Sequence, residues 1–283
     1  MRSTKFFAPL LLLLSLSTAL FSQRPVEVGS HSDAKGSVIF TAQNNTFSPY
    51  VVKVVLTKLE KGNADHEMPY EGVVRPGQNV LFKLIPTGGK DEMEFKYTVS
   101  FRKGTINAPV MMDYPYLLPL STGKETQAYV TDTRSGDAQT LYAVRLRMKP
   151  GDTIFTARRG IVTAVDAEAG VEVFQGDSSF AQYGVFRKDS IFVKAGQQVE
   201  AGQAIGIVGG DAYGRGSEAR LSVYYYKDNV IGYVPLQFWT KRNGKALLKH
   251  GGEYTSEKPV DIVQQEVKKA PAAKKTLKVK GKH

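Results

Sequence analysis

Residues 193–206, VKAGQQVEAGQAIG, decide the fold of the second half of this chain. Short β-prone runs alternate here with Gly196 and Gly202, and this punctuation predicts tight bends between short strands. Similar runs lie on both sides: residues 153–157 and 160–165 are expected to form one hairpin, and residues 221–226 one strand. Apolar residues alternate with polar ones, which is typical of a sheet with one covered face. The sequence therefore predicts an all-β unit over residues 141–250.

A second β unit precedes this one. Residues 38–40, 50–56, 80–85 and 95–101 are β-branched or aromatic runs separated by turn-forming residues, a spacing that favours a small β-sandwich. We expect this N-terminal domain to cover residues 36–112 and find no catalytic spacing in it. The following segment, residues 113–119 (DYPYLLP), contains prolines that exclude a helix. It is expected to pack against a domain surface, with an aromatic glycan-binding platform as the alternative.

Both ends of the chain differ in composition from the middle. Residues 1–22 combine Arg2 and Lys5 with an apolar run of signal-peptide length, so they predict export to the periplasm or the exterior, with a short membrane anchor as the alternative. Residues 257–283 hold eight lysines and three acidic residues. They predict a disordered basic tail, either able to contact an anionic membrane surface or solvated and without a function.

The charge and the residue counts narrow the functional classes. The net charge of +11, about +9 once Arg2 and Lys5 are removed with the signal peptide, favours anionic envelope material over nucleic acid as a partner, with general solubility as the alternative explanation. The chain has no cysteine, so disulfides and thiolate metal sites are excluded. Its four histidines are His31, His66, His250 and His283, and none lies between residues 113 and 226.

Several phrases between residues 113 and 226 resemble the lysostaphin-type (LytM-like) zinc peptidases of peptidoglycan. The sequence YLLP at 116–119 resembles the segment that precedes the catalytic domain in many exported members. GDTIFTARRGIV at 151–162 and VKAGQQVEAGQAIG at 193–206 match two hairpins of the family. The resemblance implies a LytM-like antiparallel β domain over residues 113–250. A lipoyl-type carrier domain is the competing fold, but Lys149 does not lie at the hairpin tip which that class requires.

The same alignment implies that every functional position of the family is substituted. Zinc-binding and catalytic histidines correspond to Gly136, Val185, Arg220 and Ser222, and the zinc-binding aspartate corresponds to Arg145. Catalytic zinc takes three ligands from His, Asp, Glu or Cys, and none of these replacements belongs to that set. We therefore predict a pseudoenzyme with no catalytic residue, no metal and no other cofactor.

The strand alternation gives these replacements a common direction. Residues i and i+2 of a strand share a face, so Arg145 and Arg147 are expected on one face, as are Arg220 and Ser222. Guanidinium groups bind carboxylates in bidentate fashion, which makes Arg145, Arg147 and Arg220 candidate carboxylate-binding residues. The alternative is an internal ion pair with Asp211 or Glu218.

These observations predict an exported, non-catalytic protein of the bacterial cell envelope. Its expected partners are peptidoglycan or its stem peptides and, because degenerate LytM-like domains activate other hydrolases, a cell-wall amidase. An active or cryptic metalloendopeptidase and a purely structural envelope protein are the alternatives.

Overall fold

Strands β1 to β7 form the N-terminal domain of the computed structural model, which describes residues 24–88, 93–106, 108–133, 141–210, 217–227 and 230–258. The predicted signal peptide at 1–22 and residues 259–283 of the predicted tail lie outside these ranges. The seven strands are β1 (Val26–Ser32), β2 (Val38–Asn44), β3 (Tyr50–Glu60), β4 (Gly62–Ala64), β5 (Tyr70–Val74), β6 (Gly77–Pro86) and β7 (Glu94–Lys103).

The N-terminal domain consists of two antiparallel sheets that share one apolar core. One sheet has the order β1-β2-β6-β4 and the other β5-β3-β7. Phe40 and Phe82 from the first sheet stack with their ring centroids 4.5 Å apart, and Val52 and Val54 of β3 are fully buried. Because alternate residues of these strands face inward, the two sheets bury one continuous cluster between them.

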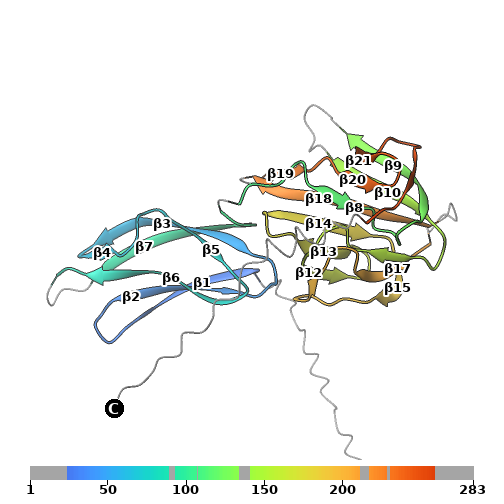
Figure 1. Cartoon of the computed structure of the whole chain (residues 1–283). Helices are drawn as coiled ribbons and strands as arrows, with labels where there is room; N and C mark the ends of the chain where they lie inside the picture. Colours follow the sequence, from blue (N-terminus) through green and yellow to red (C-terminus); the bar gives the residue numbers. More distant parts are fainter. Residues whose placement is uncertain are drawn as a thin grey trace, which may run out of the picture.

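The rest of the described chain forms the larger C-terminal domain. Its strands are β8 (Pro115–Leu117), β9 (Glu125–Thr133), β10 (Leu141–Met148), β11 (Thr153–Phe155), β12 (Gly160–Asp166), β13 (Gly170–Phe174), β14 (Ser179–Gly184), β15 (Phe186–Ile191), β16 (Gln198–Val199), β17 (Ala204–Val208), β18 (Ser217–Lys227), β19 (Val230–Tyr233), β20 (Gln237–Thr240), β21 (Gly244–Leu247) and β22 (Glu253–Thr255). Figure 1 shows this domain beside the N-terminal one.

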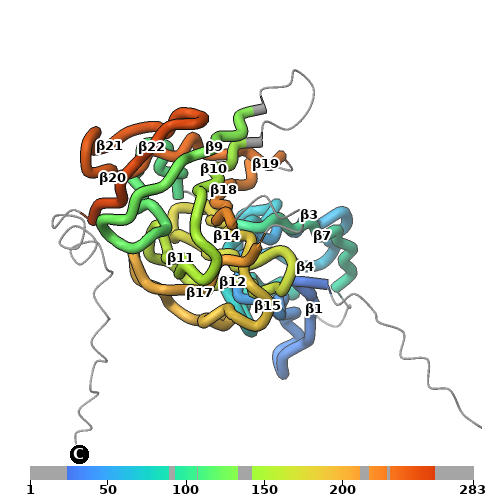
Figure 2. The backbone as a smooth tube through the Cα atoms, turned by 90° about the vertical axis from the view of Figure 1, so that its right-hand side faces the viewer, coloured from blue at the N-terminus to red at the C-terminus, as the bar shows by residue number. Residues whose placement is uncertain are grey.

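A large sheet organises the C-terminal domain. Its strand order is β16-β12-β13-β14-β18-β10-β9-β22, with β19 paired to β18; Figure 2 shows β9, β10, β18 and β14 in succession. The small sheets β11-β17-β15 and β21-β20-β8 pack near it and complete the core. No α-helix occurs in the described residues, so the all-β prediction is confirmed. Among those residues no helix is long and apolar enough to cross a membrane.

The glycine-rich stretch at 193–206 has the expected bends but not all of the expected pairings. Gly196 and Gly202 have φ values of 85° and 77°, in the region that favours glycine. The predicted hairpin of residues 153–157 with 160–165 was wrong, because β11 pairs with β17 whereas β12 pairs with β13 and β16. After β11, the Thr156 amide donates a hydrogen bond to the carbonyl of Gln203, the residue before β17. The pairing of this segment with the β17 segment therefore continues beyond β11.

The connecting segment packs as predicted against the C-terminal domain. Pro115–Leu117 forms β8, parallel to β20, and the Tyr116 side chain is fully buried. Tyr116 donates a hydrogen bond of 3.0 Å to Gln175 Oε1, and burial raises the pKa of its hydroxyl to about 12. Beyond residue 250, the expected end of this domain, β22 adds a further strand to β9.

Candidate functional site

Four of the five positions that the sequence analysis aligned with functional residues of the LytM-like peptidases come together at the centre of the large sheet. Arg145 on β10 lies directly opposite Arg220 on β18, and Ser222 on β18 lies opposite Gln182 on β14. Val185 directly follows β14, next to Gly184, the residue opposite Arg220 on the other side. Gly136 lies outside the described residues. The four described positions thus lie on β10, on β18 and directly after β14, which are neighbouring strands.

The faces of β10 and β18 alternate as the sequence predicts. Val144 and Leu146 on β10 are fully buried, as are Leu221 and Val223 on β18. The residues between them point to the opposite face of the sheet. We call Arg145, Arg147 and Arg220, which share that face, the arginine face.

A groove of about 360 Å³ lies on this side of the sheet. Arg145, Gln182, Arg220 and Ser222 line it, together with Tyr224 and Tyr233. A Cβ atom at Gly184 would lie 3.3 Å from Nε and Nη2 of Arg220. Glycine at this position therefore leaves the space beside the guanidinium group of Arg220.

The positive charges of the arginine face are only partly compensated. Arg145 Nη1 lies 3.3 Å from Glu218 Oε2, so the ion-pair alternative is right for Arg145, whose side chain keeps 44% of its surface exposed. Asp211, the other proposed partner, lies outside the described residues. Within the described ranges Arg220 has no hydrogen bond or ion pair from its guanidinium group. Like charges directly opposite on paired strands destabilise a sheet, so Arg145 and Arg220 are held together at a cost.

Arg147 and Arg145 both contact the same tyrosine, which the sequence analysis missed. Tyr129 on β9 lies opposite Arg145, and its ring centroid is 5.8 Å from Arg145 Cζ and 5.7 Å from Arg147 Cζ. Both distances fall within the range of cation–π contacts. The alternation of β9 places Tyr129 on the polar side, but only the register with β10 reveals its contacts.

The side chains at the aligned positions do not fit a zinc ion. Guanidinium groups stay protonated and offer no lone pair, and a valine offers none either. Within the part of the chain that the structure describes, Glu218 is the carboxylate paired with one of these side chains, Arg145. Among the described residues, no group of three or more His, Cys, Asp or Glu side chains is arranged to hold a metal.

The opposite end of the same face carries a buried carboxylate in contact with the N-terminal domain. Glu172 on β13 lies opposite Gln182, which places it on the face of Ser222 and Arg220. Its Oε1 lies 2.5 Å from Lys103 Nζ at the end of β7, and these side chains are only 9% and 18% exposed. Thr163 and Tyr224 also donate hydrogen bonds to its carboxylate.

The groups around Glu172 keep its carboxyl group ionised. Burial acts to raise the pKa of its carboxyl, but the nearby Lys103 ammonium and the donated hydrogen bonds hold that pKa below its ordinary value. Burial and the negative charge of Glu172 raise the pKa of the Tyr224 hydroxyl, which therefore remains a donor. The cluster is a balanced ionic contact between the two domains, and the sequence analysis did not predict it.

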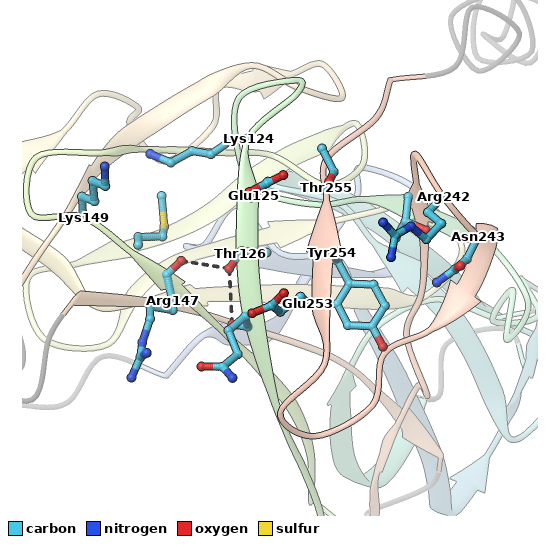
Figure 3. A pocket seen from close by; sticks show the side chains of 13 residues that line it. Lys124, Glu125, Thr126, Arg147, Lys149, Arg242, Asn243, Glu253, Tyr254 and Thr255 are labelled. Carbon is cyan, nitrogen blue, oxygen red and sulfur yellow. Dashed lines mark hydrogen bonds between the residues drawn. The ribbon is translucent and has the colours of Figure 1, made fainter.

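A larger cavity, of about 460 Å³, lies around β9, β22 and the turn after β20 (Figure 3). Lys124, Lys149 and Arg242 line it, and Lys124 forms an ion pair with Asp152. Figure 3 shows the side chain of Arg147 extending away from Lys124 and Lys149. Arg147 itself lines this cavity, whereas Arg145 and Arg220 line the groove, so the arginine face borders both.

Comparisons with known proteins give structural neighbours only. No protein-family model matches the sequence, and no curated protein matches it. A mutant catalytic domain of the prophage-encoded M23 protein EnpA of Enterococcus faecalis is 21% identical over 45% of this chain and 92% of its own, with a TM-score of 0.29. A putative M23 peptidase of Pseudomonas aeruginosa is 18% identical over 65% and 90%, with a TM-score of 0.29. Helicobacter pylori Csd3 is 14% identical over 78% and 77%, with a TM-score of 0.34.

Proposed function

We propose that this protein is an exported, non-catalytic, LytM-like protein of the bacterial cell envelope that binds peptidoglycan through a carboxylate of its stem peptide. The observation that carries the proposal is the guanidinium group of Arg220, which lies in a groove directly opposite Arg145 and has no ion-pair partner among the described residues. The lysostaphin-type motifs in the sequence supply the ligand class, and the zinc-incompatible side chains support the loss of hydrolysis.

Binding at this place has a physical rationale. A carboxylate between Arg145 and Arg220 accepts charge-assisted hydrogen bonds and removes the repulsion between the two guanidinium groups. Such bonds contribute about 1.5–3 kcal/mol each. Ser222 and Gln182, which line the same groove, add neutral hydrogen-bonding groups. Ligand binding thus supplies a counter-charge for Arg220, which the described residues provide only for Arg145.

Titration of purified muropeptides into the wild-type protein and Arg220→Ala tests the binding. We expect saturable binding by the wild type and at least about tenfold weaker binding by the variant, the loss of one charge-assisted contact. Arg242→Ala, a change at an exposed arginine of the other cavity, is the matched control and should bind like the wild type. Equal affinities for the wild type and Arg220→Ala would contradict the proposal.

Zymography on purified peptidoglycan tests the absence of catalysis. The protein should leave the gel uncleared both with and without added zinc, since the side chains at the aligned positions provide no metal-binding set. Zinc-dependent clearing that persists in Arg220→Ala would show a hydrolase and overturn the non-catalytic assignment.

A further inference from the structure

We propose that the arginine face binds an extended peptide through two carboxylates at once, the first between Arg145 and Arg220 and the second at Arg147. This inference rests on the proposed function, because its first contact is the same carboxylate site. It adds a second subsite, a spacing rule for the ligand and a positioning residue, Tyr129.

The spacing follows from the strand. Arg145 and Arg147 are two residues apart on β10 and share a face, so their Cα atoms are separated by about 7 Å along the sheet. An extended peptide has the same repeat, since its side chains at i and i+2 also lie on one side. A ligand with carboxylates on alternate residues therefore matches the two arginines in register, whereas carboxylates on adjacent residues point to opposite sides.

Tyr129 holds the two arginines in place. Both guanidinium groups lie within 6 Å of its ring centroid, and neighbouring side chains hold the ring in place. Its hydroxyl donates a 2.6 Å hydrogen bond to Gln127 Oε1, Gln127 Nε2 donates to the Gly251 carbonyl, and His250 packs edge-on at 5.5 Å. A fixed ring lowers the entropic cost of ordering two long side chains around a ligand.

The local charge leaves the second position open. Glu218 lies directly opposite Arg147 in the register, yet its carboxylate bonds to Arg145. Glu253 lies on the same face beyond Gln127, two strands from Arg147, and forms no ion pair with it. Within the described residues Arg147 therefore has an aromatic contact but no carboxylate partner.

The test is calorimetric titration of three capped tripeptides into the whole protein. Glu-Ala-Glu carries two carboxylates in the matching register, Glu-Glu-Ala carries the same charge in the wrong register, and Glu-Ala-Ala carries one carboxylate. We expect Glu-Ala-Glu to bind about tenfold more tightly than either of the others, the gain from one added charge-assisted contact. Arg147→Gln should remove this advantage, so that the variant binds Glu-Ala-Glu and Glu-Glu-Ala equally.

Two variants at residue 129 separate positioning from general structure. Tyr129→Phe keeps the ring and should retain most of the advantage, whereas Tyr129→Leu should lose it while the thermal unfolding midpoint confirms an intact fold. Equal binding of Glu-Ala-Glu and Glu-Glu-Ala would mean that net charge alone matters and would overturn the inference.

The remaining outcomes distinguish this inference from the proposed function. If Glu-Ala-Ala binds through Arg220 but Arg147→Gln has no effect on any peptide, the second subsite is wrong and the proposed function stands. If none of the peptides binds and Arg220→Ala leaves muropeptide binding unchanged, both are wrong. Tighter, Arg147-dependent binding of a phosphodiester polymer than of Glu-Ala-Glu would overturn the assignment of a peptide ligand.

Discussion

The Glu172 end and the Arg220 end of one sheet face differ in how their charges are paired. At the Glu172 end, a buried carboxylate has a cation at 2.5 Å and further donors from Thr163 and Tyr224. At the Arg220 end, Glu218 pairs with Arg145 but, within the described residues, no carboxylate pairs with Arg147 or Arg220, and Arg145 and Arg220 line a groove. The first arrangement stabilises a contact between domains. The second costs stability, and such a cost is expected where a ligand supplies the missing charge.

Removing the cation of the Lys103–Glu172 pair should have the largest effect on stability. Lys103→Met leaves the Glu172 carboxylate buried without its counter-ion, and removal of one partner of a buried pair costs about 3–5 kcal/mol. Urea denaturation measures this loss. Lys58→Met removes the surface ion pairs of Lys58 with Glu60 and Glu94 and is the matched control, with no resolved change expected.

A double variant sharpens the result of Lys103→Met. Adding Glu172→Gln removes the unpaired charge, so the double variant should recover part of the stability lost by Lys103→Met alone. If Lys103→Met lowers the free energy of unfolding no more than Lys58→Met does, the cluster is not the buried, balanced contact described above.

Acid should weaken the Lys103–Glu172 contact before it changes the charge of the arginines. The pKa of Glu172 in the folded protein lies below its ordinary value of 4.5. Its contribution is therefore complete above about pH 4.5 and is lost as the pH falls through the lower, folded-state pKa. The free energy of unfolding should fall less steeply with acid in Glu172→Gln than in the wild type. Identical slopes would mean that other carboxylates, such as Asp177, carry the acid sensitivity.

The sequence predicts one of these two ends much better than the other. Alternation along β10 and β18 is a local property, so the common face of Arg145 and Arg147 and that of Arg220 and Ser222 follow from residue spacing alone. Glu172 and Lys103 are 69 residues apart, and their contact depends on how two domains meet. The same reason explains the wrong hairpin, because β11 pairs with the distant β17 and not with its neighbour in the chain. Tyr129 was missed because its role depends on a pairing register.

The smallest change in stability, and one that should increase it, is expected when the repulsion between Arg145 and Arg220 is removed. Arg220→Gln removes the like-charge pair with Arg145, and we expect it to stabilise the unliganded protein by about 0.2–1 kcal/mol. The gain should shrink in high salt, because exposed charges are screened. Thermal unfolding at low and high ionic strength measures both.

Arg242→Gln is the control for this last change, since Arg242 is an exposed arginine in the turn between β20 and β21 with no arginine paired opposite it. Its unfolding midpoint should not depend on salt differently from the wild type. A destabilised Arg220→Gln would mean that Arg220 supports the fold through its packing over Gly184, and that the face is a structural feature. A stabilised Arg220→Gln that also loses its ligand would show stability given up for binding.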